Sequence, residues 1–365
     1  MLCIGMCPDP FVKTPWTQMA NPILHWQAEA IQEAGGKIVA LSPRQVQDPN
    51  DWRKMKLDVV HLHWPAGVYN FRVRREPLQK IIPHRLVLSW SRYRLHQWEQ
   101  AVKQLAIPIV WEVHDTLSHH AQGYNYSADF ALHKSFCQIA SGLIIHGEHA
   151  YQPIVDQFGV EKPYEVGPLG SYQRLYGPPI SRDIALEKLG LICRGKVLSY
   201  LGTARPMRNP EASISAFIRQ AGPEDLLLVA GGGVQNYLPD DRDDRVKVYE
   251  GVLSPDLFHK LLCASDFVIN DGHRYLTSAI IRAAISYARP VIARPFGSTL
   301  DMAQGAAVWI PDTPDGLVTA IQSALKMSME YWGKLSAAAA EHESLLSWQG
   351  YAAACIRLYK QLIDP

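Results

Sequence analysis

The sequence has almost no net charge and no long hydrophobic run. Its 365 residues include 36 Lys+Arg and 35 Asp+Glu, for a net charge of +1, whereas a nucleic-acid-binding domain usually has a clear basic excess. No window of 18 or more apolar residues is free of charge, and the first residues lack the long apolar stretch of a secretory signal. We therefore expect a soluble cytoplasmic protein that does not bind nucleic acid.

Cysteine is also scarce, and the usual metal and cofactor motifs are missing. The six cysteines are scattered, and the close pair Cys3 and Cys7 has no second pair to complete a metal site. His61 and His63 have no carboxylate or cysteine at ligand spacing along the chain. Neither GxxxxGK[ST] nor GxGxxG in a βαβ context occurs, which disfavours ATPases and dinucleotide enzymes. We expect no metal and no cofactor.

Short apolar, β-branched runs alternate with segments of helical periodicity, a pattern that indicates βαβ units and parallel sheets. The predicted strands are Lys37 to Leu41, Val59 to Leu62, Ile107 to Val113, Gly142 to His146, Lys196 to Leu201, Leu226 to Ala230, Val246 to Tyr249, Phe267 to Asn270 and Pro290 to Ala293. The predicted helices are Leu24 to Ala34, Trp98 to Leu105, Asn209 to Gln220, Pro255 to Ala264, Ser278 to Tyr287 and Pro314 to Lys326.

The chain divides near its middle, where Gly167 to Gly170 and Gly177 to Pro179 interrupt the pattern. We predict two doubly wound α/β domains, residues 1–175 and 176–345, and a final amphipathic helix in 346–365 that packs back on the first domain. Loops at the carboxyl ends of two such sheets would face each other across a cleft, where doubly wound sheets bind ligands.

The segment from Lys196 to Phe217 has the features of a diphosphate site. A strand leads into a turn at Gly202, two arginines follow at Arg205 and Arg208, and a helix begins near Pro210. Glycine permits close backbone approach, and the helix start presents free N–H groups beside the positive charge. An ordinary helix start has a similar sequence, so this alternative stays open.

A second candidate loop follows the predicted strand that ends at Asn270. Thr277 and Ser278 stand at the expected start of a helix, where hydroxyl and N–H groups can bind phosphate or sugar oxygens, although a simple N-cap would look the same. The glycine run that includes Gly232 could bring backbone close to a base or ribose.

Polar residues also end a strand in the first half of the chain, at Glu112, His114 and Asp115. A carboxylate or imidazole at the cleft could act as a general base on a hydroxyl group. A structural role for each histidine is the alternative.

Positive charge is concentrated in one region. Between Arg53 and Lys103 there are 11 Lys+Arg against three acidic residues, and the stretch from Phe71 to Trp98 mixes arginine with aromatic and aliphatic residues. This composition is typical of a surface that contacts anionic lipid or a lipid phosphate. A solvated basic helix with a buried apolar face is the alternative.

Four motifs in the right order resemble the GT-B glycosyltransferases, and within them the bacterial exopolysaccharide enzymes of the xanthan-type β-1,4-mannosyltransferase group. The matching stretches are Asp58 to Pro65 (DVVHLHWP), Glu112 to His119, Leu201 to Asn209 and Asn270 to Val291. The resemblance implies two Rossmann-like domains facing across a cleft, of which the first binds the acceptor and the second binds the nucleotide sugar.

The resemblance also implies roles for individual residues. Arg205 and Arg208 would hold the donor diphosphate, and Asp115 would be the base, with Glu112 as its competitor and His114 beside them. Arg274 and Arg282 stand where a broad retaining group has two glutamates, so Arg282 could meet extra negative charge on the donor. The full predicted donor site is Gly202, Arg205, Arg208, Gly232, Glu250, His273, Arg274, Thr277, Ser278 and Arg282. The predicted acceptor and membrane residues are His63, Trp64, Arg72, Arg74, Arg75, Trp90 and Arg94.

On this basis we expect an inverting, metal-independent transfer of a sugar to a polyprenyl-diphosphate-linked oligosaccharide in exopolysaccharide biosynthesis. GDP-mannose is the first choice of donor, and a UDP-sugar (glucose, N-acetylglucosamine or glucuronate) is the second. The enzyme would lie at the inner face of the cell membrane, in peripheral contact with anionic lipid. A sugar-nucleotide epimerase and a non-catalytic partner subunit of the same fold are the remaining alternatives.

Overall fold

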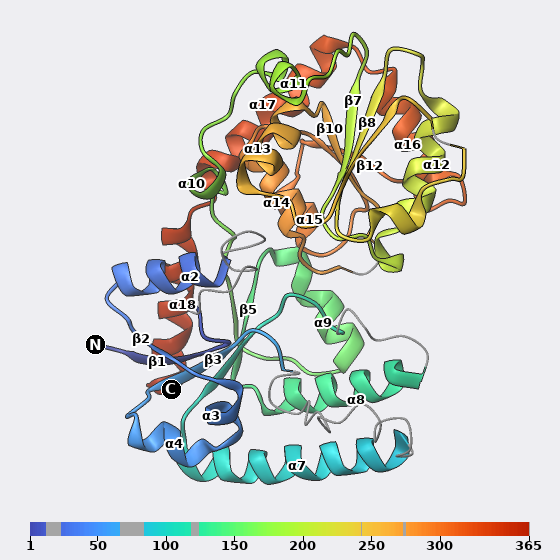
Figure 1. Ribbon diagram of the computed structural model, residues 1–365. Helices are drawn as coiled ribbons and strands as arrows, with labels where there is room; N and C mark the ends of the chain where they lie inside the picture. Colours follow the sequence, from blue (N-terminus) through green and yellow to red (C-terminus); the bar gives the residue numbers. More distant parts are fainter. Residues whose placement is uncertain (12–22, 66–83, 118–123, 242, 273–274, 365) are drawn as a thin grey trace.

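The computed structural model describes residues 1–11, 23–65, 84–117, 124–241, 243–272 and 275–364. Two six-stranded sheets, one in each half of the chain, are flanked by helices and lie one above the other (Figure 1). The first sheet consists of β1 (Cys3–Cys7), β2 (Lys37–Ala40), β3 (Val59–Leu62), β4 (Ile109–Glu112), β5 (Gly142–Ile145) and β6 (Tyr164–Val166). The second consists of β7 (Val197–Leu201), β8 (Leu226–Gly231), β9 (Val246–Glu250), β10 (Phe267–Asn270), β11 (Val291–Ala293) and β12 (Ala307–Trp309).

Helices cover the faces of both sheets. The helices of the first half are α2 (Ile23–Glu33), α3 (Pro43–Gln47), α4 (Pro49–Lys54), α7 (His84–Leu105), α8 (Tyr124–Ile139), α9 (Tyr151–Phe158) and α10 (Gln173–Tyr176). Those of the second half are α11 (Arg182–Leu189), α12 (Pro210–Gln220), α13 (Pro255–Ala264), α14 (Ala279–Ser286), α15 (Ser298–Met302), α16 (Gly316–Leu325), α17 (Met329–Leu345) and α18 (Trp348–Ile363). Short 3-10 turns are η1 (Glu148–Ala150), η2 (Pro206–Arg208) and η3 (Val234–Tyr237).

The strand order of each sheet indicates where a ligand would bind. The first sheet has the order β2-β1-β3-β4-β5-β6 and the second β12-β11-β10-β7-β8-β9, and the pairings within each are parallel. In the second sheet the order reverses between β7 and β10, and in the first between β1 and β3. Ligands of doubly wound sheets bind at such points, outside the carboxyl ends of the strands.

Most predicted elements are confirmed, and the differences have clear causes. All nine predicted strands form, but β1, β6 and β12 were not predicted. β1 contains Gly5, which is unfavourable inside a strand, yet it is held between β2 and β3. Helix α7 begins at His84, well before the predicted start at Trp98.

The last helix, α18, crosses back to the first half of the chain (Figure 1). It packs against α2, β5 and β6, and its buried face includes Tyr351, Cys355 and Tyr359. The domain boundaries at 175/176 and 345/346 stay predictions. Among the residues described, none of the helices combines the length and the apolar character needed to span a membrane.

Candidate active site

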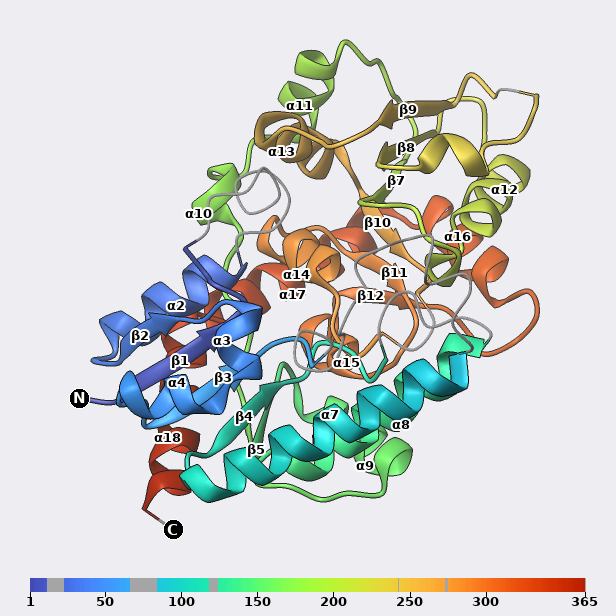
Figure 2. The same cartoon turned by 60° about the horizontal axis from the view of Figure 1, so that its bottom comes forward.

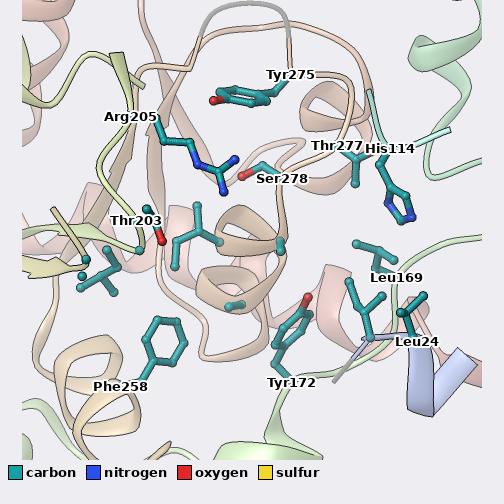
Figure 3. Close-up of a pocket in the computed structure, with 18 of the residues that line it drawn as sticks. Leu24, His114, Leu169, Tyr172, Thr203, Arg205, Phe258, Tyr275, Thr277 and Ser278 are labelled. Atoms are coloured by element: carbon teal, nitrogen blue, oxygen red, sulfur yellow. The ribbon is translucent and has the colours of Figure 1, made fainter. Parts of the chain in front are cut away.

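A cavity of about 880 Å³ lies between the two sheets. The loops after β1, β3 and β4 line it from one side, and the loops after β7, β8, β9 and β10 line it from the other. These loops include both points at which the strand order reverses, so the cavity occupies the position expected for a ligand site in this architecture. Figure 3 shows how its walls are built.

The loop after β7 supplies two arginines with different surroundings. Gly202 has a φ of 100°, a backbone conformation that favours glycine. Arg208 donates to the carbonyl oxygens of Leu201 (2.9 Å) and Thr203 (3.3 Å) and thereby holds the loop. The side chain of Arg205 instead points into the cavity toward Ser278 (Figure 3).

The start of α14 faces Arg205. Ser278 is the N-cap residue, but its side chain makes no capping bond and accepts from Asn270 Nδ2 at 2.5 Å. Thr277 Oγ1 lies 3.4 Å from the hydroxyl of Ser298. The first-turn N–H groups and the guanidinium of Arg205 therefore border one space, a combination that favours an anion.

Asp115 follows β4 and reaches the opposite half of the molecule. Its Oδ1 accepts a hydrogen bond from the backbone N–H of Leu276 at 3.2 Å, and it lines the cavity beside His114. Burial raises the pKa of the Asp115 carboxyl well above its usual range, although the Leu276 bond and the charge of Arg205 oppose this shift. A carboxylate with a raised pKa is suited to accept a proton near neutral pH.

Glu112 does not face the cavity, which corrects its prediction as a competing base. Its side chain is fully buried, and an acceptor hydroxyl group cannot reach it. Oε1 accepts a hydrogen bond from Gln27 Nε2 at 2.6 Å, and Oε2 accepts one from the hydroxyl of Tyr351. Burial alone would raise the pKa of Glu112, but the surrounding histidines outweigh burial and hold that pKa well below its usual range.

Four histidines surround this carboxylate, an arrangement that was not predicted from the sequence. His61 and His63 belong to β3 and its end, His114 follows β4, and His146 follows β5. These strands are neighbours, so their carboxyl ends meet at one edge of the sheet. Burial lowers the pKa of His114 well below its usual range, and the charge of Glu112 offsets only part of that shift.

Arg282 does not reach the cavity, which corrects its prediction as a donor ligand. Its side chain is fully buried, Nη2 lies 2.6 Å from the carboxylate of Glu343, and Nε donates to the carbonyl oxygen of Leu169 at 2.7 Å. Glu250 also has a local structural partner. Its carboxylate accepts hydrogen bonds from the N–H groups of Gly233 (2.7 Å) and Gln235 (2.9 Å).

The remaining predicted site residues lie in the cavity, in the histidine group, on α7 or outside the described residues. Gly232 lines the cavity, as does Trp64, whose indole stacks on the ring of His114 at 5.3 Å. His63 is buried in the histidine group, and Trp90 and Arg94 lie on α7. Five predicted residues lie outside the described residues: Arg72, Arg74, Arg75, His273 and Arg274.

One wall of the cavity is apolar, comes from both halves of the chain and was not predicted from the sequence. Figure 3 shows part of this wall opposite Arg205. Its residues include Ile23, Leu24, Leu169, Tyr172, Tyr176, Leu253, Phe258, Ile280 and Ala283. They lie on α2, on α10 and the segment before it, and on or near α13 and α14, elements whose apolar residues are typical of core-facing helices. A ligand here would have a charged part near Arg205 and a flat or apolar part near this wall.

The comparisons with known proteins identify the fold. Neither a protein-family model nor a curated protein matches the chain. A sucrose-phosphate synthase from Thermosynechococcus elongatus superposes with a TM-score of 0.73 at 16% identity, over 99% of each chain. HepE from Anabaena in complex with UDP-glucose gives 0.67 at 13% identity, over 99% of this chain and 100% of that one. The MnaA–UDP structure from S. aureus gives 0.59 at 12% identity, over 100% and 96%.

This likeness establishes the fold as GT-B, the class of two doubly wound domains that face each other across a cleft. The fold class predicted from the sequence is thereby confirmed.

Proposed function

We propose that the protein is a glycosyltransferase that takes its sugar from a nucleoside diphosphate sugar. The observation that carries this proposal is the pairing, across one cavity, of an anion-binding corner with a half-buried carboxylate. Arg205 and the start of α14 form the corner, and Asp115 is the carboxylate. A diphosphate and a hydroxyl group could therefore be held in one site.

In the proposed reaction, the acceptor hydroxyl oxygen attacks the anomeric carbon of the donor sugar while the bond from that carbon to the diphosphate breaks. Asp115 takes the proton of the hydroxyl group. Arg205 and the N–H groups of α14 stabilise the charge that develops on the diphosphate, in place of a metal ion at that position. Attack on the face opposite the diphosphate inverts the configuration at the anomeric carbon.

Two donors are candidates within this class. GDP-mannose comes first because the HLHWP and ARPV motifs resemble those of the mannosyltransferase group. A UDP-sugar comes second because two solved structures of the same fold hold UDP-glucose or UDP. The buried position of Arg282 removes the reason to expect a donor sugar with an extra carboxylate.

For the acceptor, we propose a polyprenyl-diphosphate-linked oligosaccharide at the inner face of the cell membrane. Helix α7 supports this because it exposes Leu86 (61%), Trp90 (46%) and Tyr93 (58%), and the guanidinium of Arg94 lies 5.8 Å from the ring of Trp90. Aromatic and cationic side chains together suit the interface of an anionic bilayer.

A sedimentation assay with vesicles tests the membrane contact. The protein should co-sediment with vesicles that contain phosphatidylglycerol. The double variant W90S/Y93S should show a bound fraction several-fold lower than that of the wild type. Vesicles of phosphatidylcholine alone serve as the control for charge. Equal binding by the wild type and the variant would contradict the role of α7.

A thermal-shift screen against GDP, UDP, dTDP and their sugar conjugates tests the proposed function. A ligand that binds only the folded protein raises its melting temperature. Selective stabilisation by GDP and GDP-mannose supports the first donor, and selective stabilisation by UDP-sugars supports the second. Isomerisation of the donor sugar without acceptor would favour an epimerase, and no binding of any nucleotide would favour a non-catalytic subunit.

A further inference from the structure

Glu112 and four histidines form the most concentrated group of potential ligand atoms in the described part of the chain. Oε1 of Glu112 lies 3.3 Å from His114 Nε2 and 3.2 Å from His146 Nε2. The same oxygen lies 3.4 Å from His63 Nδ1, which is 3.1 Å from His114 Nε2. On the other oxygen, Oε2 lies 3.1 Å from His61 Nε2. This arrangement brings four nitrogen atoms to one buried carboxylate.

The orientation of His146 directs one ring nitrogen at the carboxylate of Glu112. Its Nδ1 lies 2.8 Å from the carbonyl oxygen of Gly167, which can only accept, so Nδ1 carries the proton. In the neutral ring, Nε2 then has a lone pair, and this atom lies 3.2 Å from Oε1 of Glu112. A lone pair beside an ionised carboxylate is unfavourable unless a proton or a metal ion lies between them.

Neighbouring residues hydrogen-bond to His146 and Glu112 in the way that residues around a metal site hydrogen-bond to its ligands. Ligating histidines usually donate their second ring N–H to a carbonyl or carboxylate, as His146 does to Gly167. Ligating carboxylates are hydrogen-bonded in turn, as Glu112 is by Gln27 and Tyr351. All of these partners are fixed by neighbouring strands or by packed helices, so the nitrogen and oxygen atoms are already in place.

The nitrogen atoms of His63, His114 and His146 lie 3.2–3.4 Å from Oε1 of Glu112, which is the separation of neighbouring ligand atoms in a known coordination geometry. A tetrahedral zinc ion with bonds of about 2.0–2.1 Å separates its ligand atoms by about 3.3 Å. We propose that Glu112, His114 and His146, together with His63, bind one divalent transition-metal ion of the zinc class. Imidazole nitrogen and carboxylate oxygen are ligands that zinc accepts.

The proposed ion has a structural role, and its site is separate from the anion-binding corner formed by Arg205 and the start of α14. Its ligands come from the ends of β3, β4 and β5, so it would fasten three strands at the edge that borders the cavity. Asp115 directly follows His114, so the ion would also fix the start of the loop that carries the proposed base. This inference does not rest on the proposed function, because ion binding is measured without any nucleotide.

Metal analysis of the untagged, full-length protein tests the inference. After incubation with zinc and removal of free ion, the wild type should retain about one ion per chain by mass spectrometry, and cobalt should give the visible absorption of a tetrahedral site. H146Q and E112Q should each retain at least ten-fold less metal. H25Q, which changes a half-exposed histidine of α2 outside this group, is the matched control and should retain the full amount.

A second measurement covers the case in which a variant fails to fold. Chelator treatment of the wild type should lower its melting temperature, and added zinc should restore it, because an ion that binds only the folded state stabilises that state. Wild-type protein without retained zinc or cobalt, and with the same melting temperature before and after chelation, would overturn the inference. In that case the histidines form a network neutralised by a proton, and nucleotide binding is unaffected.

Discussion

At the scale of single residues, Asp115 has the position and the surroundings of a general base. Asp115→Asn keeps an oxygen that can accept the hydrogen bond from Leu276, so contact between the two halves should persist. The variant loses the group that takes the proton, and turnover should fall by about 10²- to 10⁴-fold. Steady-state kinetics and a separate measurement of donor affinity check this expectation.

The control for this variant is Asp156→Asn on the exposed side of α9, which should leave turnover unchanged. Donor affinity should be the same in all three proteins. Turnover of Asp115→Asn within a few-fold of the wild type would remove Asp115 from the base role.

Arg208 and Arg205 should respond differently to the same substitution. Because Arg208 bonds two carbonyl oxygens of its own loop and lies 4.9 Å from the ring of Tyr200, Arg208→Ala should destabilise the fold by about 1 kcal/mol as well as weaken donor binding. Arg205→Ala should weaken donor binding with little change in stability. Urea unfolding of both variants separates the two roles, and equal losses of stability would contradict the distinction.

At the scale of elements, Arg282 links α14 to α17 and to the segment before α10. Replacing one partner of a buried ion pair leaves the other charge uncompensated, so Arg282→Met should lower the free energy of unfolding by about 3 kcal/mol. Donor affinity should not change, because Arg282 lies outside the cavity. Denaturant unfolding and calorimetry check the two statements.

The double variant R282M/E343Q is the control for the Arg282 prediction, because it removes both charges. It should recover part of the lost stability. A single variant that weakens donor binding ten-fold while folding normally would contradict the structural role.

Helix α18 is fastened to the first sheet by two tyrosines. Tyr351 bonds Glu112, and the hydroxyl of Tyr359 bonds Nδ1 of His61. Tyr351→Phe removes a donor from a buried carboxylate and should cost about 1–3 kcal/mol. Thermal unfolding checks this value, with the exposed Tyr331→Phe on α17 as the control. An unchanged melting temperature would show that packing alone holds α18.

The sequence predicted most of this architecture because strand and helix periodicities are local. Strands β6 and β12 have three residues each and lie at the edges of their sheets, and they exist because a neighbouring strand pairs with them. The site was predicted where a motif is contiguous, as in the loop of Arg205. It was missed where residues from separate strands meet, as with His61 and Glu112, because sheet order is not a local property.

At the scale of the whole molecule, function depends on bringing two sheets together. The cavity borders the strand-order reversal of each sheet, and Asp115 bonds Leu276 across it. Figure 2 shows the second view of this arrangement, with α7 running across the front of the first half. The proposed base comes from one domain and the anion-binding corner from the other. The proposed reaction therefore requires that the two domains keep their relative position.

In the proposed function, this cavity binds a nucleoside diphosphate sugar through Arg205. Titration calorimetry with GDP-mannose and UDP-glucose on the wild type, Arg205→Ala and the exposed control Arg219→Ala of α12 measures this binding. We predict that one donor binds the wild type and the control equally and binds Arg205→Ala at least ten-fold more weakly, a difference of about 1.4 kcal/mol. Equal affinity of all three proteins, or no binding of either donor, would contradict the account.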